Sequence, residues 1–249
     1  MNLKKFVKTG LILAASLVPA ANLHAEEWEV TIAPYLWAAA ENGKVATLPG
    51  APPAEIDLEF DDILDGLEIA FMGAIDAKKG RAGIYADIIY LSIDTDEVDT
   101  PGPFYSGADY EAEVVVVTLL GTYRYDLGDT AVDLLGGVRL WDADNQLNLK
   151  PGIAAATDVD EADDWLDWMV GAASLTPLND DWSFTAGGVV AIAGDSNHQF
   201  DVYAYFQYAL SESSELVFGY RYLEVDYDND DFLYDVEIQG PIFGAIFKL

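Results

Sequence analysis

The sequence predicts an all-β fold: a closed antiparallel up-and-down transmembrane barrel of about ten strands, with eight or twelve as alternatives. Apolar residues recur with a period of two, which is the period of a strand that has one apolar face. The alternating segments run for about ten to fourteen residues, a length that suits strands crossing a bilayer at a tilt. Tight turns and longer acidic connections follow one another along the chain, as expected when both chain ends lie on one side of a membrane.

The first residues have the features of an export signal. Three lysines precede an apolar run from Leu11 to about Ala21, and the small residue Ala25 stands before Glu26. This order predicts a cleaved secretory signal peptide over residues 1–25. No later composition shift is typical of a linker, so residues 26–249 are predicted to form one barrel domain.

The charge and composition of the remaining chain exclude several classes of protein. Without the three leader lysines, the chain has nine basic and 44 acidic residues, which gives a net charge of −35. Nucleic acid is excluded as a partner because its phosphates would be repelled. The absence of cysteine excludes a disulfide scaffold. A content of 51% hydrophobic and 12% aromatic residues argues against disorder.

The alternation is clearest in segment 198–209, where Phe200 and Val202 begin an apolar face and Asp201 and Tyr203 begin the opposite one. The predicted strands are, in order, 27–39, 67–78, 82–93, 111–125, 130–142, 165–176, 181–193, 198–209, 214–226 and 233–249.

The connections assign the two ends of the barrel. The second, fourth, sixth and eighth strands are followed by the tight turns "KKG", "DLGD", "TPLNDD" and "SESS". The other connections are acidic, and the first three are long and rich in glycine and proline. Short turns face the periplasm in barrels of this kind, so the acidic loops are predicted to lie outside the cell.

Alternation also predicts a charged interior. A charge that faces lipid costs about 2–4 kcal/mol near the bilayer midplane, so charges within strands should face the lumen. The inward charges are predicted to be Arg124, Arg139, Arg221, Asp76, Asp87, Asp133, Asp167 and Asp201.

Counting residues from the turns gives these charges partners. The predicted pairs are Arg139 with Asp167, Arg124 diagonally with Asp133, and Arg221 with Asp87 across the lumen. They would form either a structural salt-bridged network or the lining of a narrow polar path. A barrel of about ten strands is little wider than the eight-stranded size that side chains fill, which argues against a large pore.

Aromatic residues near the strand ends predict the interfacial girdles of a membrane barrel. The predicted girdle residues are Tyr35, Trp37, Tyr90, Tyr123, Trp168, Trp182, Tyr220 and Tyr222.

One short stretch, "GDSNHQFD", contains residue types used in catalysis. Asp195, Ser196, His198 and Asp201 combine a nucleophile with a possible general base. Any polar turn has a similar composition, so the sequence predicts no enzyme, with a rim-located hydrolase or lipid-modifying enzyme as the alternative.

A second stretch, "DYDNDDFLYDVE", resembles a calcium loop in its spacing. Asp226, Asp228 and Asp230 take ligand positions, but Asp231 occupies the position that requires glycine, and strands flank the loop instead of helices. The prediction is therefore no cofactor, with loosely bound calcium or magnesium at the acidic outer loops as the alternative.

The segment from Gly187 onward combines "GG", a short acidic loop, a hairpin, "GYRY", "VDY" and a final strand containing "GP". With "TIAPYLWAA" and "LGGVRLW" in the front half, it resembles a large, mostly uncharacterised family of proteobacterial outer-membrane β-barrel proteins. The resemblance implies a fold and a location. The expected partners are outer-membrane lipids, lipopolysaccharide and the assembly machinery, with the oligomeric state open.

The last strand has apolar residues on both phases. Tyr234 and Val236 alternate on one phase, whereas Phe243 and Phe247 alternate on the other. A bulge at Gly240-Pro241 is predicted to reconcile them.

Together these observations predict an integral outer-membrane barrel with a structural or surface-interacting role. The alternatives are a narrow channel for small solutes or ions and a soluble periplasmic ligand-binding barrel.

Overall fold

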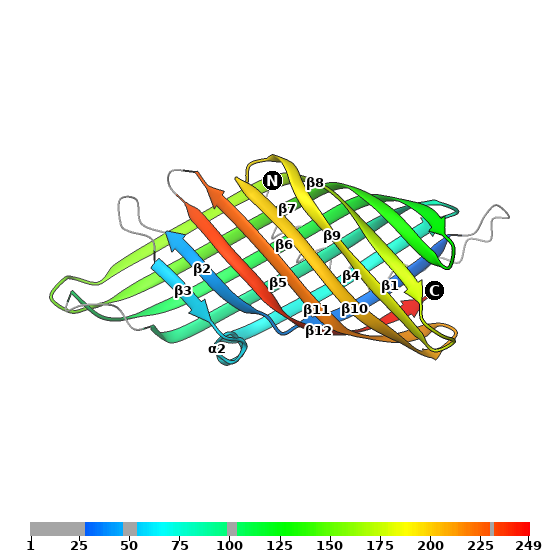
Figure 1. The fold of residues 1–249 in the computed structure, drawn as a ribbon. Coiled ribbons are helices and arrows are strands. Elements are labelled where there is room, and N and C mark those ends of the chain that lie inside the picture. The colour runs from blue at the N-terminus through cyan, green and yellow to red at the C-terminus, as the bar shows by residue number, and fades with distance from the viewer. Residues whose placement is uncertain (1–27, 47–53, 99–103, 230–231) are drawn as a thin grey trace.

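The computed structural model describes residues 28–46, 54–98, 104–229 and 232–249. Ten strands form a closed antiparallel barrel (Figure 1), in which β1 pairs with both β4 and β12 and so closes the cylinder. The fold class and the strand count of ten confirm the prediction. The barrel strands are β1 (Glu29–Trp37), β4 (Leu67–Lys79), β5 (Ala82–Val98), β6 (Tyr105–Leu127), β7 (Thr130–Pro151), β8 (Thr157–Pro177), β9 (Trp182–Gly194), β10 (His198–Ser211), β11 (Ser214–Asp228) and β12 (Leu233–Lys248).

The tight turns gather at the end of the barrel that carries the C-terminus, here called the periplasmic end (Figure 1). Lys79 pairs with Ala82, and Leu127 pairs with Thr130. The first turn residue is glycine in both cases, with φ of 60° at Gly80 and 65° at Gly128. Two-residue hairpin loops need such positive φ values, which glycine adopts without strain.

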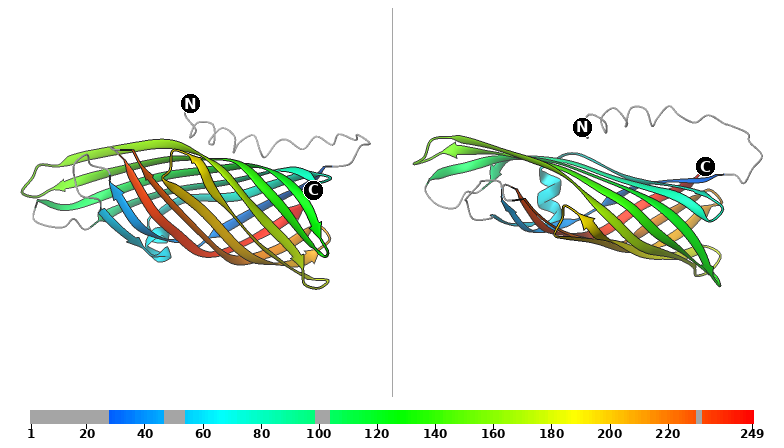
Figure 2. Two further views of the ribbon diagram at one scale, coloured as in Figure 1. Left: turned by 45° about the horizontal axis from the view of Figure 1, so that its top comes forward. Right: turned by 90° about the horizontal axis from the view of Figure 1, so that it is seen from above.

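The acidic connections predicted as long loops are in large part strands. β6, β7 and β8 are 23, 22 and 21 residues long, and they pair with one another far beyond the point where β9 ends. β9 pairs with β8 only as far as Gly194, opposite Asp167. The long strands consequently project past the rest of the barrel at its outer end, as Figure 2 shows.

The first predicted loop also contains regular structure. β2 (Ala40–Ala46) pairs with the outer half of β12, and β3 (Ala54–Leu58) pairs with β2. The short helix α2 (Phe60–Asp65) leads into β4. β12 therefore pairs with β1 in its periplasmic half and with β2 in its outer half.

The predicted bulge at Gly240-Pro241 is wrong. β11 and β12 pair without a register shift from Ser214–Phe247 to Asp228–Leu233. Val236 is buried in the lumen, whereas Phe243 is 53% exposed on the outer wall. Both phases are apolar because the outer half of the lumen is itself apolar, so no bulge is needed.

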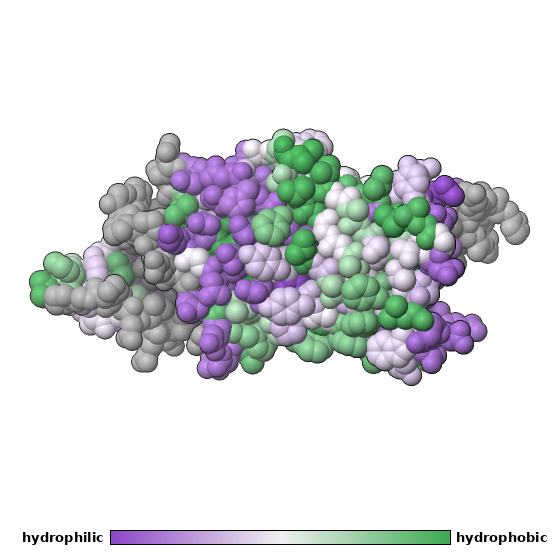
Figure 3. All heavy atoms as spheres, in the orientation of Figure 1, coloured by the Kyte–Doolittle hydropathy of each residue, from purple (hydrophilic) through white to green (hydrophobic). Residues whose placement is uncertain are grey.

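Apolar side chains cover the outer wall of the barrel in the half nearer the periplasmic end, among them Ile75, Phe206 and Phe218. Figure 3 shows hydrophobic and weakly polar residues over this half, with hydrophilic residues at the tips of β10–β12 and along the opposite rim. This is the surface pattern of a lipid-embedded barrel.

Two of the predicted girdle residues face the lumen, and a third, Tyr90, is buried against Val115 with 8% of its surface exposed. Tyr123, Trp168 and Tyr220 are exposed on the outer wall, but Trp37 is 5% exposed and Tyr35 hydrogen-bonds inside the lumen. On β1 the even positions face outward, so the odd ones face inward. The two residues therefore belong to the interior.

Candidate functional site in the barrel interior

One buried carboxylate joins two arginines in the middle of the lumen. Asp201 on β10 accepts hydrogen bonds from Arg139 Nη2 at 2.6 Å and from Arg221 Nε and Nη2 at 3.0 and 2.7 Å. Asp201 and Arg139 are each 2% exposed. A shared carboxylate lets two buried guanidinium groups lie side by side, because each finds the opposite charge it needs.

The other side of the lumen completes this cluster. Arg221 Nη2 lies 3.6 Å from Asp87, and its Nη1 donates to the hydroxyl of Tyr35 at 3.0 Å. Tyr35 in turn donates to Asp87 at 2.9 Å. The Arg221 guanidinium also lies over the Trp37 ring, 4.8 Å from its centroid, as in a cation–π contact. We call Arg139, Arg221, Asp201 and Asp87 the upper charge cluster.

A second cluster lies nearer the periplasmic end. Arg124 Nε and Nη2 each donate to Asp133 at 2.8 Å in a bidentate pair. Lys78 lies 3.3 Å from Asp133 and also pairs with Asp76. The predicted diagonal arrangement is wrong, because Arg124 and Asp133 are directly opposite in the β6–β7 register. We call Arg124, Asp133, Lys78 and Asp76 the lower charge cluster.

Asp167 has a different partner from the one predicted. It is opposite Arg139 in the β7–β8 register and is fully buried. Its carboxylate accepts from the backbone N–H of Ser196 at 3.0 Å and from the Ser196 hydroxyl at 2.6 Å. Because β9 ends at Gly194, the β9–β10 turn comes close to Asp167 and supplies these donors.

Stacked aromatic rings fill the lumen outward of the upper charge cluster. The Trp165 ring stacks on Tyr227 with centroids 4.3 Å apart, and on Trp141 with centroids 5.3 Å apart. Trp141 is 1% exposed. We call the following residues the aromatic plug: Trp141, Trp165, Tyr227, Phe232 and Tyr234.

The plug belongs to a larger buried apolar cluster with side chains from seven strands, β1, β5, β6, β7, β8, β11 and β12. On β7 and β11 the change from polar to apolar takes two residues, from Arg139 to Trp141 and from Arg221 to Leu223. The lumen therefore has two chemically distinct halves.

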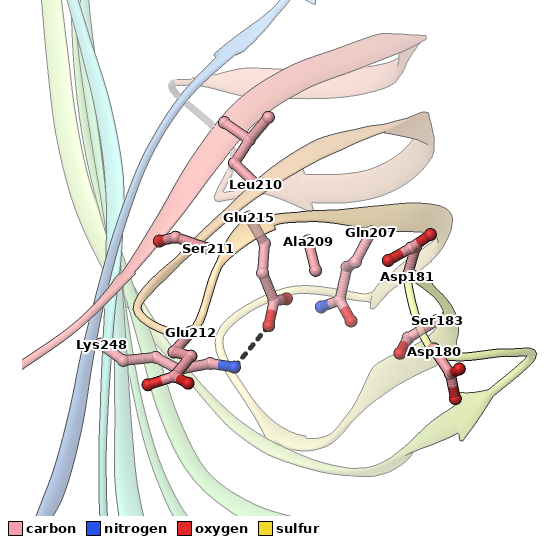
Figure 4. A pocket seen from close by; sticks show the side chains of 10 residues that line it. All are labelled: Asp180, Asp181, Ser183, Gln207, Ala209, Leu210, Ser211, Glu212, Glu215 and Lys248. Carbon is pink, nitrogen blue, oxygen red and sulfur yellow. Dashed lines mark ion pairs between the residues drawn. The ribbon is translucent and has the colours of Figure 1, made fainter.

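The inner half contains a cavity of about 790 Å³, which we call the vestibule. The vestibule extends from Lys248 and Gln207, near the periplasmic turns, to Arg139 and Arg221 at its closed end in the middle of the lumen. Figure 4 shows an adjoining pocket at the periplasmic mouth, where Lys248 and Glu215 form an ion pair of 2.5 Å.

The candidate catalytic residues do not form one site. The Ser196 hydroxyl donates to Asp167, and Asp201 faces the lumen. His198 lies on the outer face, with its Nε2 2.7 Å from Glu224 and its Nδ1 3.4 Å from Asp226. A Ser–His pair for nucleophilic catalysis would need these two side chains in contact.

The candidate metal ligands are also dispersed. Asp226 pairs with His198 and accepts a hydrogen bond from Asn197 at 3.1 Å. Asp228 ends strand β11, and Asp230 lies outside the described residues. Within the part of the chain that the structure describes, no three acidic or histidine side chains are grouped as a metal site.

Glu224 lies near the outer end of β11, beside His198, and has a lowered pKa. Its pKa is lowered from the usual value, chiefly because His198 hydrogen-bonds to the carboxylate, with a second hydrogen bond from Tyr222. The outer rim therefore carries a hydrogen-bonded carboxylate that stays ionised.

Sequence reasoning missed several interior residues. Trp141 and Trp165 are two positions outward from Arg139 and Asp167, so alternation puts them on the same inward face. Continuing the inward-facing positions by two residues along each strand, from the predicted inward charges, would have identified both tryptophans. For Tyr35, the signal was its odd position on β1, between the outward residues Ile32 and Leu36.

No protein-family model and no curated protein sequence matches the chain. The finer resemblance to an uncharacterised family therefore stays a prediction.

Among the solved structures that align with most of the chain are the following three. The outer-membrane protease OmpT of Escherichia coli has a TM-score of 0.58 at 8% identity, covering 92% of this chain and 99% of that one. The translocator domain of the autotransporter NalP of Neisseria meningitidis has a TM-score of 0.48 at 13% identity, covering 98% and 96%. The attachment invasion locus protein Ail of Yersinia pestis has a TM-score of 0.36 at 11% identity, covering 90% and 100%. Identities this low show a shared fold alone. The chain thus shares the β-barrel fold of OmpT.

Proposed function

We propose that this protein is a closed, non-enzymatic outer-membrane barrel with a structural or surface-interacting role. The observation that carries the proposal is the aromatic plug, which fills the lumen between the upper charge cluster and the outer end. Ions and small solutes would have to cross this apolar layer, and such constrictions block conduction by excluding water.

Side chains from several strands and two hydrogen bonds hold the aromatic plug in place, which favours a stable closure. Its rings come from β7 and β8 on one part of the wall and from β11 and β12 on another. The hydroxyl of Tyr227 donates to Asp163 at 2.6 Å, and that of Tyr234 donates to Glu41 at 3.0 Å. Opening the lumen would break both stacking and hydrogen bonds.

The outer end supports a role at the cell surface. β6, β7 and β8 carry acidic residues beyond the point where β9 ends, including Glu113, Asp144 and Asp158. An acidic projecting sheet would meet lipopolysaccharide and its associated cations. The lipids around the wall and the machinery that assembles the barrel are its other proposed partners.

Conductance in planar lipid bilayers tests the closure. The unmodified protein should give no steady conductance, and a variant combining Trp165→Ala with Tyr227→Ala should give discrete steps. Trp168→Ala is the matched control, because Trp168 lies on the same strand and is 56% exposed on the outer wall. Heat-dependent gel migration would verify that each variant is folded.

Steady conductance by the unmodified protein would contradict the proposal and favour the narrow channel. Recovery of the protein in the soluble periplasmic fraction would favour a soluble ligand-binding barrel instead. The apolar outer wall argues against that outcome, because a large exposed apolar surface promotes aggregation in water.

A further inference from the structure

The vestibule contains polar groups that have no partner in the described part of the chain. Arg139 Nη1 and Thr122 Oγ1 are buried without a hydrogen bond. No hydrogen bond is formed there by the hydroxyls of Tyr85 and Tyr203 or by the amide of Gln207, and all five residues line the cavity. The two hydroxyls and the amide are therefore open to the cavity, where water or a ligand can form hydrogen bonds with them.

The charges around the vestibule nearly balance, with six acidic and five basic side chains in its lining. Five of the nine basic residues beyond the leader line it, although acidic residues greatly outnumber basic ones in the chain. Each of the five forms an ion pair. They are Lys78, Arg124, Arg139, Arg221 and Lys248. A ligand with a net charge would remain uncompensated in this enclosed space, so a neutral ligand fits best.

The mouth of the vestibule supports the same conclusion. Figure 4 shows Asp180, Asp181 and Glu212 around the periplasmic pocket, with Lys248 already paired to Glu215. Anionic solutes would be repelled at this entrance, and cationic solutes would be held there. Neutral solutes pass such a ring without either effect.

Tyrosines give the wall its remaining character. Tyr35, Tyr85, Tyr203 and Tyr205 all line the vestibule, and the rings of Tyr203 and Tyr205 stack with centroids 5.7 Å apart. A tyrosine offers an apolar ring and a hydroxyl that donates and accepts. The complementary ligand has hydroxyl groups next to apolar C–H surfaces, which is the chemistry of a sugar ring.

We propose that the vestibule binds a neutral saccharide that enters from the periplasmic end. Its volume of about 790 Å³ accommodates one or two sugar rings and falls within the usual range of small-molecule sites. Tyr85, Tyr203 and Gln207 would bind sugar hydroxyls along the wall. This binding goes beyond the closed-barrel role and does not depend on whether the lumen conducts.

Isothermal titration calorimetry tests the inference, with folded protein in a detergent that has no sugar headgroup. Glucose and maltose are the neutral probes, while glucuronate and glucosamine are charged probes with a similar ring. At least one neutral sugar should bind, and its charged analogues should bind at least about tenfold more weakly. An absence of heat with both neutral sugars at millimolar concentrations would overturn the proposal. Equal or tighter binding of a charged probe would also overturn it.

Two variants locate the site. Tyr203→Phe and Gln207→Ala should each weaken sugar binding about three- to tenfold, the effect of losing one hydrogen bond. Tyr220→Phe is the matched control, because this hydroxyl lies on the outer wall, where it donates to Gln239. If Tyr203→Phe does not fold, Tyr85→Phe replaces it. Unchanged binding in the folded interior variants would place any sugar site outside the vestibule.

Discussion

Replacing Asp201 with asparagine should strongly destabilise the barrel. The substitution keeps the size of the side chain and removes the charge that Arg139 and Arg221 share. One of the two accepting oxygens becomes an NH₂ group, which would point a donor at a guanidinium donor. Two buried cations would thus lose their common anion.

The expected size of the effect follows from the contacts. Breaking a buried ion pair by removing one partner costs about 3–5 kcal/mol of unfolding free energy. Asp201 accepts three charge-assisted hydrogen bonds, which favours the upper part of that range. Asp87 remains 3.6 Å from Arg221 and offsets part of the loss. We therefore expect about 3 kcal/mol for Asp201→Asn.

Urea unfolding in lipid vesicles, followed by tryptophan fluorescence and gel migration, measures this loss. Asp226→Asn is the control at the outer rim, where the carboxylate is partly exposed and the change should cost less than about 1 kcal/mol. A loss for Asp201→Asn as small as that of the control would refute the reasoning. Combining Asp201→Asn with Arg139→Met should cost less than the sum of the single losses, because both remove one interaction.

Three further predictions concern other layers of the barrel. Gln199→Leu should raise the unfolding free energy in urea by about 1–3 kcal/mol, because its buried amide has no partner among the described residues. His198→Ala should move the pKa of Glu224 back toward its usual value of about 4.3. The lowered pKa of Glu224 stabilises the fold at pH values above the pKa of this group in the unfolded chain. This stabilisation, under about 1 kcal/mol, is lost as the pH falls through the pKa in the folded state. Acid unfolding of the unmodified protein and of His198→Ala measures the difference. Gly128→Ala should cost about 1 kcal/mol in urea because its φ is 65°, whereas Gly136→Ala, with φ outside that region and no atom closer than 4.0 Å, should cost little.

The strand positions could be predicted because a membrane barrel imposes a local rule. Each strand must alternate between lipid and lumen, so the period of two persists through segments such as 198–209. The tight turns were visible for a similar reason, since Gly80 and Gly128 supply the positive φ values that short hairpins require. Both signals depend on neighbouring residues alone.

The outer ends of the strands could not be predicted in the same way. Aspartate and glutamate disfavour strands, so the acidic stretches resembled loops. In the structure Glu113 is opposite Asp144, and Asp142 is opposite Asp164, within continuous ladders. Pairing with an adjacent strand satisfies the backbone and overrides the local preference, and only the three-dimensional fold shows which neighbour is available.

The choice of partners across the lumen was also beyond the sequence. Residue counting gives the height of Arg139 and shows that it faces inward, and on that basis Asp167 is its nearest acidic neighbour. The observed partner is Asp201, three strands away in the sheet order, because Ser196 in the β9–β10 turn satisfies Asp167. Distances across a closed barrel depend on its cross-section and on its turns, which alternation does not encode.

The layering of the lumen separates the proposals from one another. Along β11, Arg221 belongs to the upper charge cluster, Leu223 to the apolar layer and Tyr227 to the aromatic plug. Conductance tests the plug, urea unfolding tests the charge cluster, and sugar titration tests the vestibule below it. Because the vestibule is reached from the periplasmic end, opening the plug should leave sugar binding intact. Loss of binding in the Trp165→Ala and Tyr227→Ala double variant would show instead that the two halves of the lumen are coupled through the upper charge cluster.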